Sequence, residues 1–302
     1  MNSLKKLKTS DFTELEKFFK THKYNLCEYS LSSIIFWDNC INDIFYHISG
    51  EKLFIAEVSM ENPLKRKLLL PLSLPFKFLT PKLLASYAKK LSFQYFYYVP
   101  QNYLDSTKIE EIEKYFNIYE QAAYANYIYK TADLALLKGS KYSKKRNLLS
   151  QFKKNNPQTV KISSMTNSSL QDIMTMFDSW KKQQDIKITE KLLECEKKAI
   201  KNSLENFKAL KMSGIQIFIN GILSAFAMGS ELNENTFCLN FQKALPDIKG
   251  LYQFLNNEFM KTIPPKYIYL NKENDLGKEG LKKSKLSYYP IEIIKSYIFE
   301  IK

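Results

Sequence analysis

Short apolar runs and amphipathic stretches alternate through the first 137 residues and predict a mixed α/β domain. Residues 44–48 and 53–58 are apolar and are separated by a turn segment, which is the pattern of a β-hairpin. A helix is expected at residues 82–91, because Pro81 fits the first turn of a helix. Residues 124–137, rich in tyrosine, isoleucine and alanine, are expected to be extended.

The second half of the chain shows a different order of elements. After Pro157 the pattern predicts one strand, two helices, a three-stranded antiparallel meander and a further helix. Asn220-Gly221 between two apolar runs is a strong hairpin signal within the meander. The expected strands are residues 159–163, 215–219, 222–228 and 236–241, and the expected helices are residues 168–184, 189–210 and 251–262.

A basic segment between the two halves is predicted to be a helix over residues 138–155. Tyr142, Arg146, Leu149 and Phe152 recur at spacings of four, three and three residues, which places them on one helical face. Arg146 is therefore expected to point toward the apolar side, where a charged group requires an acceptor. That acceptor is either a structural carboxylate or a substrate.

Polar residues gather after a predicted buried strand at residues 266–270. Carboxylate and amide side chains come first, Gly277 then changes the chain direction, and a short helical turn carries lysines. Because open α/β sheets place their sites at the carboxyl ends of strands, this segment is a candidate active site. The alternative is a charged surface loop with solvated lysines. The polar residues are Asn271, Glu273, Asn274, Asp275, Lys282, Lys283, Lys285, Ser287 and Tyr288.

Three motifs carry a resemblance to a known family. Residues 271–290 read N-x-E-x-D-L-G and L-K-K-S-K-L-S-Y-x-P, residues 138–147 form a basic block, and Gln242-Lys-Ala244 precedes Gly250 and Tyr252. In this order they resemble the phosphatidylglycerol lysyltransferase C-terminal domain family, which is GNAT-like and related to the Fem peptidyltransferases. The resemblance implies an α/β (α+β) fold of two tandem GNAT-like acyltransferase domains, each a mixed, largely antiparallel sheet flanked by helices. We place the N-terminal domain at residues 1–137, a basic linking helix at 138–156 and the C-terminal domain, with the motifs, at 157–302.

The resemblance also implies roles for the motif residues. Glu273 or Asp275 is expected to orient an amine or the acceptor, and Lys243 is grouped with them as catalytic, while Lys243 and Arg146 are expected to bind anionic groups. An ion pair between Asp275 and Lys285 that only holds the loop is the alternative. Lys282 stands where the family commonly has arginine, and Asn126 where an acid is typical. The expected substrate-binding residues are Lys141, Lys145, Arg146, Asn147, Asn271, Lys283, Lys285, Ser287 and Tyr288.

The loop before the predicted helix at residues 251–262 bears on the identity of the acyl donor. Coenzyme A-dependent GNAT enzymes usually carry a glycine-rich pyrophosphate loop here, whereas residues 245–250 contain one glycine and an aspartate. This favours an aminoacyl-tRNA over acetyl-CoA as acyl donor, with no bound cofactor and with a lipid or a small amine or hydroxyl compound as acceptor. The alternatives are a coenzyme A-dependent N-acetyltransferase and a non-catalytic protein of the same fold that binds tRNA or anionic lipid.

Composition narrows these alternatives only in part. The 302 residues carry a net charge of +14, with 45 basic against 31 acidic residues. Such a field attracts polyanions such as tRNA, and allows peripheral contact with anionic lipid, although a lysine-rich composition alone gives the same charge. No apolar run reaches the roughly 18–20 residues of a membrane helix, and no secretory signal is evident, so a cytoplasmic protein is expected. The family resemblance implies a protein of bacterial type. Four cysteines and two histidines lack metal-ligand spacing, which argues against a metal site or a Cys-His nucleophile.

Overall fold

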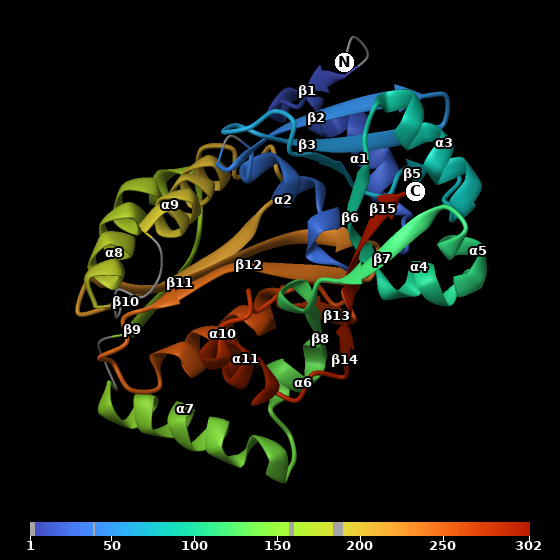
Figure 1. Cartoon of the computed structure of the whole chain (residues 1–302). Coiled ribbons are helices and arrows are strands. Elements are labelled where there is room, and N and C mark those ends of the chain that lie inside the picture. Colours follow the sequence, from blue (N-terminus) through green and yellow to red (C-terminus); the bar gives the residue numbers. More distant parts are fainter. Residues whose placement is uncertain (1–3, 39, 157–159, 184–189) are drawn as a thin grey trace.

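Two β-sheets, one built mainly from the first half of the chain and one mainly from the second, form the framework of the protein (Figure 1). The structure, a computed structural model, describes residues 4–38, 40–156, 160–183 and 190–302. The first sheet has the order β1-β2-β3-β4-β6-β15-β7, with β5 paired to β3. Its strands are β1 (Lys5–Lys6), β2 (Asn42–Ser49), β3 (Lys52–Ser59), β4 (Arg66–Leu68), β5 (Leu72–Ser73), β6 (Tyr95–Pro100), β7 (Phe116–Glu120) and β15 (Ser296–Ile301).

The second sheet has the order β14-β8-β13-β12-β11-β10-β9. The pairs β10–β11 and β11–β12 are antiparallel, as the predicted meander requires, whereas β13 lies parallel to β12. β13 ends beside Cys238 of β12, with which Asn271 pairs, and the candidate motif follows from that end. The strands are β8 (Asn126–Lys130), β9 (Val160–Ser164), β10 (Ser213–Ile219), β11 (Ile222–Asn233), β12 (Thr236–Ala244), β13 (Tyr269–Asn271) and β14 (Glu292–Ile294).

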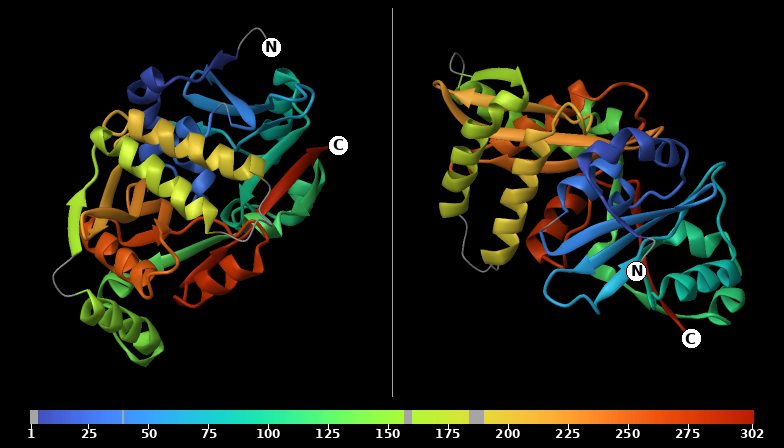
Figure 2. Two further views of the ribbon diagram at one scale, coloured as in Figure 1. Left: turned by 90° about the vertical axis from the view of Figure 1, so that its left-hand side faces the viewer. Right: turned by 90° about the horizontal axis from the view of Figure 1, so that it is seen from above.

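Helices cover both faces of the second sheet. The helices α8 (Leu170–Lys182) and α9 (Glu190–Glu205) lie side by side on one face (Figure 2). The opposite face is covered by α10 (Leu251–Thr262), against which α6 (Thr131–Leu136) and α7 (Ser143–Asn155) pack. The remaining α-helices are α1 (Phe12–Lys20), α2 (Leu31–Phe36), α3 (Pro81–Leu91), α4 (Gln101–Asp105), α5 (Ile109–Glu113) and α11 (Glu279–Leu286). No helix in these described ranges combines the length and apolar character needed to cross a membrane.

The two sheets exchange strands across the boundary expected from the sequence. β8 precedes residue 137 yet pairs with β13 and β14 in the second sheet. β15, at the carboxyl end of the chain, lies between β6 and β7 in the first sheet. One hydrophobic core also runs across both halves, and Phe36 of α2 packs on Phe241 of β12 with ring centroids 5.1 Å apart. The division at residues 137 and 157 stays a prediction, and it does not coincide with the division between the sheets.

Several expected elements are present with shifted ends. The hairpin is formed by β2 and β3, the meander by β10 to β12, and the predicted helix at 82–91 is α3. The Thr80 hydroxyl accepts the Leu83 N–H at 3.4 Å and caps α3. Residues 159 and 189, where two expected elements begin, and residue 184, where a third ends, lie outside the described residues. The expectation of extended structure throughout 124–137 is wrong, because after β8 the chain turns into α6 and buries Leu134.

A close approach of two strands requires glycine at position 229. A Cβ atom on Gly229 would lie 2.1 Å from the Cys238 carbonyl oxygen and 2.6 Å from the Phe237 ring. We expect Gly229→Ala to lower the free energy of unfolding by about 1–3 kcal/mol, because β12 must move away from β11 to make room. Urea unfolding measures the change. Gly280→Ala is the matched control: nothing lies within 4 Å of its added Cβ, and a loss of stability there as large as at Gly229 would contradict this explanation.

Candidate active site

The chain turns sharply after β13, and a network of amides holds this turn. Glu273 has a backbone φ of +60°, a conformation that residues other than glycine seldom adopt. The buried Asn271 stabilises it by accepting the Glu273 N–H at 2.6 Å. The Asn271 amide also donates to Asn126 Oδ1 at 2.8 Å, and Asn126 accepts the Cys27 N–H. The structure thus gives Asn271 and Asn126 a role in positioning the Glu273 backbone.

Two carboxylates lie beside this turn and form an acid pair, Glu28 and Glu273. Glu273 accepts a hydrogen bond from Asn240 of β12 at 3.0 Å, and burial raises the pKa of its carboxyl group. Glu28, in the 3-10 helix Cys27–Tyr29, accepts from Asn274 at 3.1 Å, and burial raises its pKa to about 6. Burial, followed by the charges of both carboxylates, raises the pKa of the Cys27 and Cys238 thiols, and the charge of Glu28 also raises that of Glu273. The pair is thus a proton-accepting group active near neutral pH rather than near pH 4.

Three lysines form the other side of the site, and we call Lys145, Lys272 and Lys285 the lysine triad. The Lys285 ammonium, on α11, donates to the Lys272 carbonyl and to the Glu273 carbonyl at 3.3 Å. Lys272 donates to Asn256 Oδ1 at 2.7 Å. Lys145, on α7, donates to the Ser287 hydroxyl at 2.7 Å and lies 4.0 Å above the ring of the buried Tyr288. Four separate segments therefore converge here.

The electrostatics of the lysine triad are unusual. Burial lowers the pKa of Lys285 and of Lys145. Burial and the charges of those two lysines lower the pKa of Lys272 to about 7. None of the ion pairs formed within the described ranges of the chain includes a member of the lysine triad. The site is therefore polarised between the acid pair and the lysine triad, and within the triad the nearby charges of Glu273 and Asp275 act on Lys285 alone.

The structure places the other predicted site residues differently. Both Asp275 carboxylate oxygens are engaged, by the Tyr127 hydroxyl at 2.5 Å and by the Gly277 N–H at 2.8 Å, so Asp275 holds the loop. The ion pair between Asp275 and Lys285, which was the alternative to a catalytic role, is not formed; Lys285 donates to backbone carbonyls instead. Lys243 pairs with Glu196 at 2.8 Å. Catalytic roles for Asp275 and Lys243 stay predictions.

The predicted residues of the basic block lie mostly at the surface. The expectation that Arg146 points toward the apolar side is wrong: it is exposed, and its guanidinium donates to the carbonyls of Leu137 and Gly139, both at 2.6 Å. These carbonyls precede α7. By donating to them, the Arg146 guanidinium finds acceptors for its charge without a carboxylate. Lys141, Asn147 and Lys283 are exposed as well, and Lys141 and Lys283 have weak ion pairs with Asp133 and Glu279, at 3.9 and 3.8 Å.

Glu28, Lys272 and Asn256 belong to the site although sequence reasoning did not select them. Lys272 lies inside the N-x-E motif, so its place between two selected residues was an available signal. Asn256 follows the apolar stripe of α10 and showed no distinguishing pattern. Glu28 comes from the other half of the chain, and only the fold brings it to Asn274.

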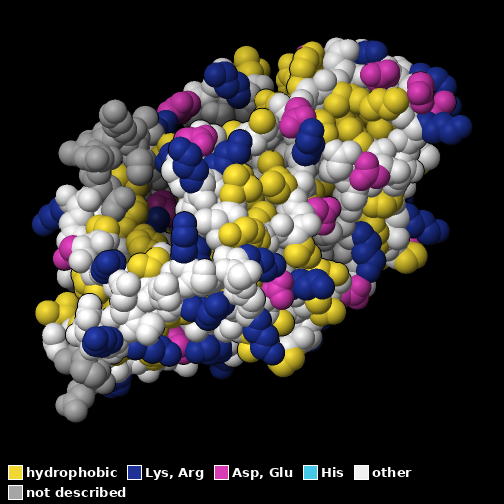
Figure 3. Space-filling view, turned by 90° about the horizontal axis from the view of Figure 1, so that it is seen from below, with side chains coloured by type: hydrophobic (Ala, Val, Ile, Leu, Met, Phe, Trp, Pro, Cys, Tyr) yellow, Lys and Arg dark blue, Asp and Glu magenta, His cyan; other side chains and the backbone are white. Residues whose placement is uncertain are grey.

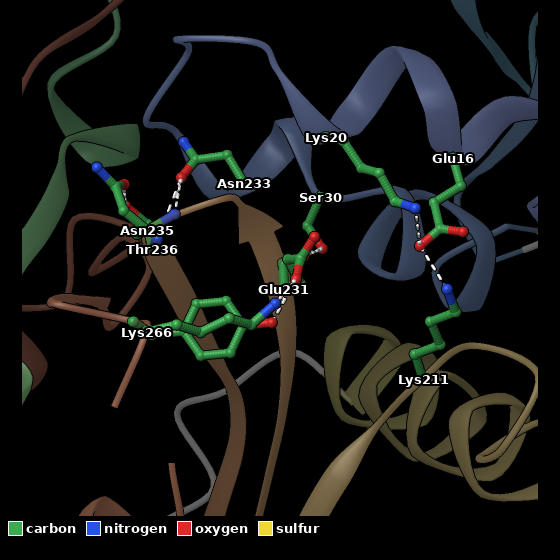
Figure 4. A network of polar contacts seen from close by, with 10 residues as sticks. Glu16, Lys20, Ser30, Lys211, Glu231, Asn233, Asn235, Thr236 and Lys266 are labelled. Carbon is green, nitrogen blue, oxygen red and sulfur yellow. Dashed lines mark hydrogen bonds and ion pairs between the residues drawn. The ribbon is translucent and has the colours of Figure 1, made fainter. Parts of the chain in front are cut away.

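Two surface hollows lie elsewhere and have a different character. One of about 580 Å³ is lined by α1, α2 and the loop around Lys266, and one of about 350 Å³ lies near Lys6. In the larger hollow each lysine has a carboxylate partner, as Figure 4 shows: Lys20 and Lys211 contact Glu16, and Lys266 contacts Glu231 at 2.9 Å. Hydrogen bonds with Tyr267 and then with Glu231 raise the pKa of Lys266, the opposite of the effect in the lysine triad. We therefore interpret this hollow as a neutralised junction between elements.

Comparison with known proteins identifies the family. The model of the family described as phosphatidylglycerol lysyltransferase, C-terminal, matches residues 83–300. A conserved protein of unknown function from Bacteroides thetaiotaomicron is similar in structure, with a TM-score of 0.89 and 29% identity over 99% of both chains. The C-terminal domain of a putative lysylphosphatidylglycerol synthetase from Agrobacterium fabrum has a TM-score of 0.62 and 13% identity, over 97% of this chain and 92% of that one.

A tandem GNAT protein from the clavulanic acid biosynthesis pathway shares the fold, with a TM-score of 0.51 and 8% identity over 99% of this chain and 98% of that one. The predicted fold class, an α/β protein with tandem GNAT-like units, is confirmed by this likeness and by the two mixed sheets. Among curated protein sequences none matches the chain.

Proposed function

The chain belongs to the phosphatidylglycerol lysyltransferase C-terminal family, and from that premise we propose that it transfers an aminoacyl group from aminoacyl-tRNA to a lipid or to a small amine or hydroxyl compound. The observation that carries the proposal is the polarised site after β13. An aminoacyl ester of RNA has a positively charged amine at one end and phosphates at the other. The acid pair and the lysine triad offer complementary charge at the corresponding ends of the site.

The chemistry requires no covalent intermediate with the protein. The acceptor nitrogen or oxygen forms a bond to the acyl carbonyl carbon, and the ester C–O bond to the ribose breaks. The Glu273 carboxylate takes the proton of the acceptor, and the Lys285 ammonium supplies a proton to the leaving ribose oxygen. Both groups suit this exchange at neutral pH, because burial raises the pKa of Glu273 and lowers that of Lys285.

The surroundings of α10 bear on the choice of donor. Gly250 caps the start of this helix with a φ of +84°, and a Cβ there would lie 2.5 Å from the Leu148 carbonyl of α7. Helix α7 therefore packs close against the start of α10, where the coenzyme A pyrophosphate is expected in a GNAT enzyme that uses it. This close packing supports aminoacyl-tRNA over acetyl-CoA as the donor.

The direct test is transfer of a radiolabelled amino acid. The purified protein is incubated with tRNA charged with single labelled amino acids and with either anionic phospholipid vesicles or small amines, and label in the acceptor is measured. Label transfer from one charged tRNA supports the proposal and names the donor. Transfer of acetyl groups from acetyl-CoA alone would overturn it. Salt-sensitive tRNA binding without any transfer would instead show a binding protein of this fold.

The pH profile gives a second prediction, with Glu28 as a positioning residue. Transfer is expected to rise as Glu273 ionises and to fall as Lys285 loses its proton, so the profile is a bell near neutral pH. The charges that face Glu273 are Glu28, Glu196 and Lys285. Glu28→Gln removes one negative neighbour, which lowers the pKa of Glu273 and moves the acidic limb to lower pH. The dependence of kcat/KM on pH measures this, and an unshifted acidic limb would contradict coupling between the two carboxylates.

A further inference from the structure

We infer that the lysine triad, together with the side-chain amide of Asn256, is a binding site for a phosphate group of the substrate. The inference deepens the proposed function and rests on it for the identity of the substrate. It names two residues beyond the predicted ones, Lys272 and Asn256. Asn256 and Lys285 supply the buried donors of the site, and Lys145 and Lys272 supply half-buried ones.

The first argument is an unsatisfied donor. Asn256 is 1% exposed, and its Nδ2 atom has no hydrogen-bond partner among the described residues. The Lys272 ammonium can only donate, so its contact at 2.7 Å identifies the other amide atom as Oδ1. Nδ2 is therefore a buried donor beside Lys272 that lacks an acceptor, and leaving such a group unpaired is costly. An oxyanion at this place would satisfy it.

The second argument is the accumulation of positive charge, which carboxylates offset in the lysine triad only at Lys285. Lys145 and Lys272 both lie over the Tyr288 ring, at 4.0 and 4.8 Å, and Lys285 is only 8% exposed. Hydrogen bonds from these ammonium groups go to neutral acceptors, namely Ser287, Asn256 and backbone carbonyls. In the hollow near Lys266, by contrast, the lysines meet carboxylates. The charges of Glu273 and Asp275 act on Lys285 but not on Lys145 or Lys272, so an anion beside these two lysines is expected to stabilise the free protein.

The third argument is the geometry of approach. The donors come from four segments of the chain, namely α7, α10, α11 and the turn after β13. A phosphate group has several acceptor oxygens and can accept from donors on different sides. Lys145 and Lys272 are half-buried and thus remain reachable. Helix α7 continues outward with exposed basic residues, and Figure 3 shows Lys and Arg side chains along this edge of the molecule.

The test separates binding from catalysis by using Lys272→Met. We expect this variant to bind inorganic phosphate at least tenfold more weakly than the wild type by isothermal titration calorimetry. We also expect its Tm without ligand to be unchanged or raised, because a buried and repelled charge is removed. Lys266→Met is the matched control, since Lys266 is paired with Glu231 outside the site, and it should bind phosphate as the wild type does. Wild-type affinity in Lys272→Met, or no phosphate binding by the wild type, would overturn the inference.

Two further probes identify the source of the phosphate. A trinucleotide RNA and glycerophosphoglycerol are titrated against the wild type and Lys272→Met. If the RNA binds more tightly and its binding depends on Lys272, the site holds a phosphate of the donor. If glycerophosphoglycerol does so, the site holds the phosphate of a lipid acceptor. Lys272-dependent binding without any aminoacyl transfer supports the inference while rejecting the proposed function. Aminoacyl transfer with an unchanged KM in Lys272→Met would support the proposed function and reject the inference.

Discussion

Replacing Glu273 by glutamine is expected to lower the rate of aminoacyl transfer by about 10²- to 10⁴-fold, the usual contribution of a positioned general base. Glutamine has nearly the same shape and can still meet Asn240, but it cannot accept a proton at neutral pH. The loss should appear in kcat. Phosphate binding at the lysine triad should persist, because Lys285 contacts the Glu273 backbone carbonyl and not its carboxylate.

The control for this change is Glu292→Gln, which neutralises an exposed carboxylate on β14. Its transfer rate should match that of the wild type, because Glu292 lies outside the polarised site. Single-turnover measurements with the charged tRNA identified in the label-transfer assay give the comparison. Equal rates for Glu273→Gln and the wild type would mean that Glu273 is not the base, and would return attention to Asp275 and Lys243.

The sequence predicted best what depends on local pattern. The Asn220-Gly221 turn has a φ above zero at both residues, as its hairpin requires, so these two residues were enough to predict the turn. Pro81 and the Thr80 cap likewise determine where α3 begins. Glu273, Lys285 and Tyr288 could be selected because one short segment carries them, and the fold brings them together with Lys145.

What the sequence could not predict depends on contacts between distant segments. Glu28 reaches the site only because the two halves pack together, and no nearby residue signals it. Arg146 follows the helical spacing of Tyr142 and Phe152, yet its long side chain turns back to the carbonyls before α7, a choice that spacing does not determine. The β7 and β15 strands were missed for a related reason, since their partners in the sheet are remote in sequence.

A large loss of stability is expected for Phe299→Ala. Phe299 on β15 is fully buried, with its ring centroid 5.2 Å from that of Phe116 and 5.8 Å from that of Tyr103. Truncating a buried phenylalanine typically removes about 3–5 kcal/mol from the free energy of unfolding, a large share of the roughly 5–15 kcal/mol of a whole domain. The variant should therefore unfold at a much lower urea concentration.

The comparison variant is Ile293→Ala on β14, the preceding strand in the chain, which belongs to the second sheet. The Ile293 side chain is 44% exposed, and the expected change is within about 0.5 kcal/mol. If β15 is an integral part of the first sheet, Phe299→Ala weakens the packing of residues near the start of the chain. Hydrogen exchange of the β6 and β7 amides would then accelerate together with those of β15. Unchanged exchange in β6 and β7 would mean that the amino-terminal half folds without β15. That result would support the predicted domain boundary at residue 137.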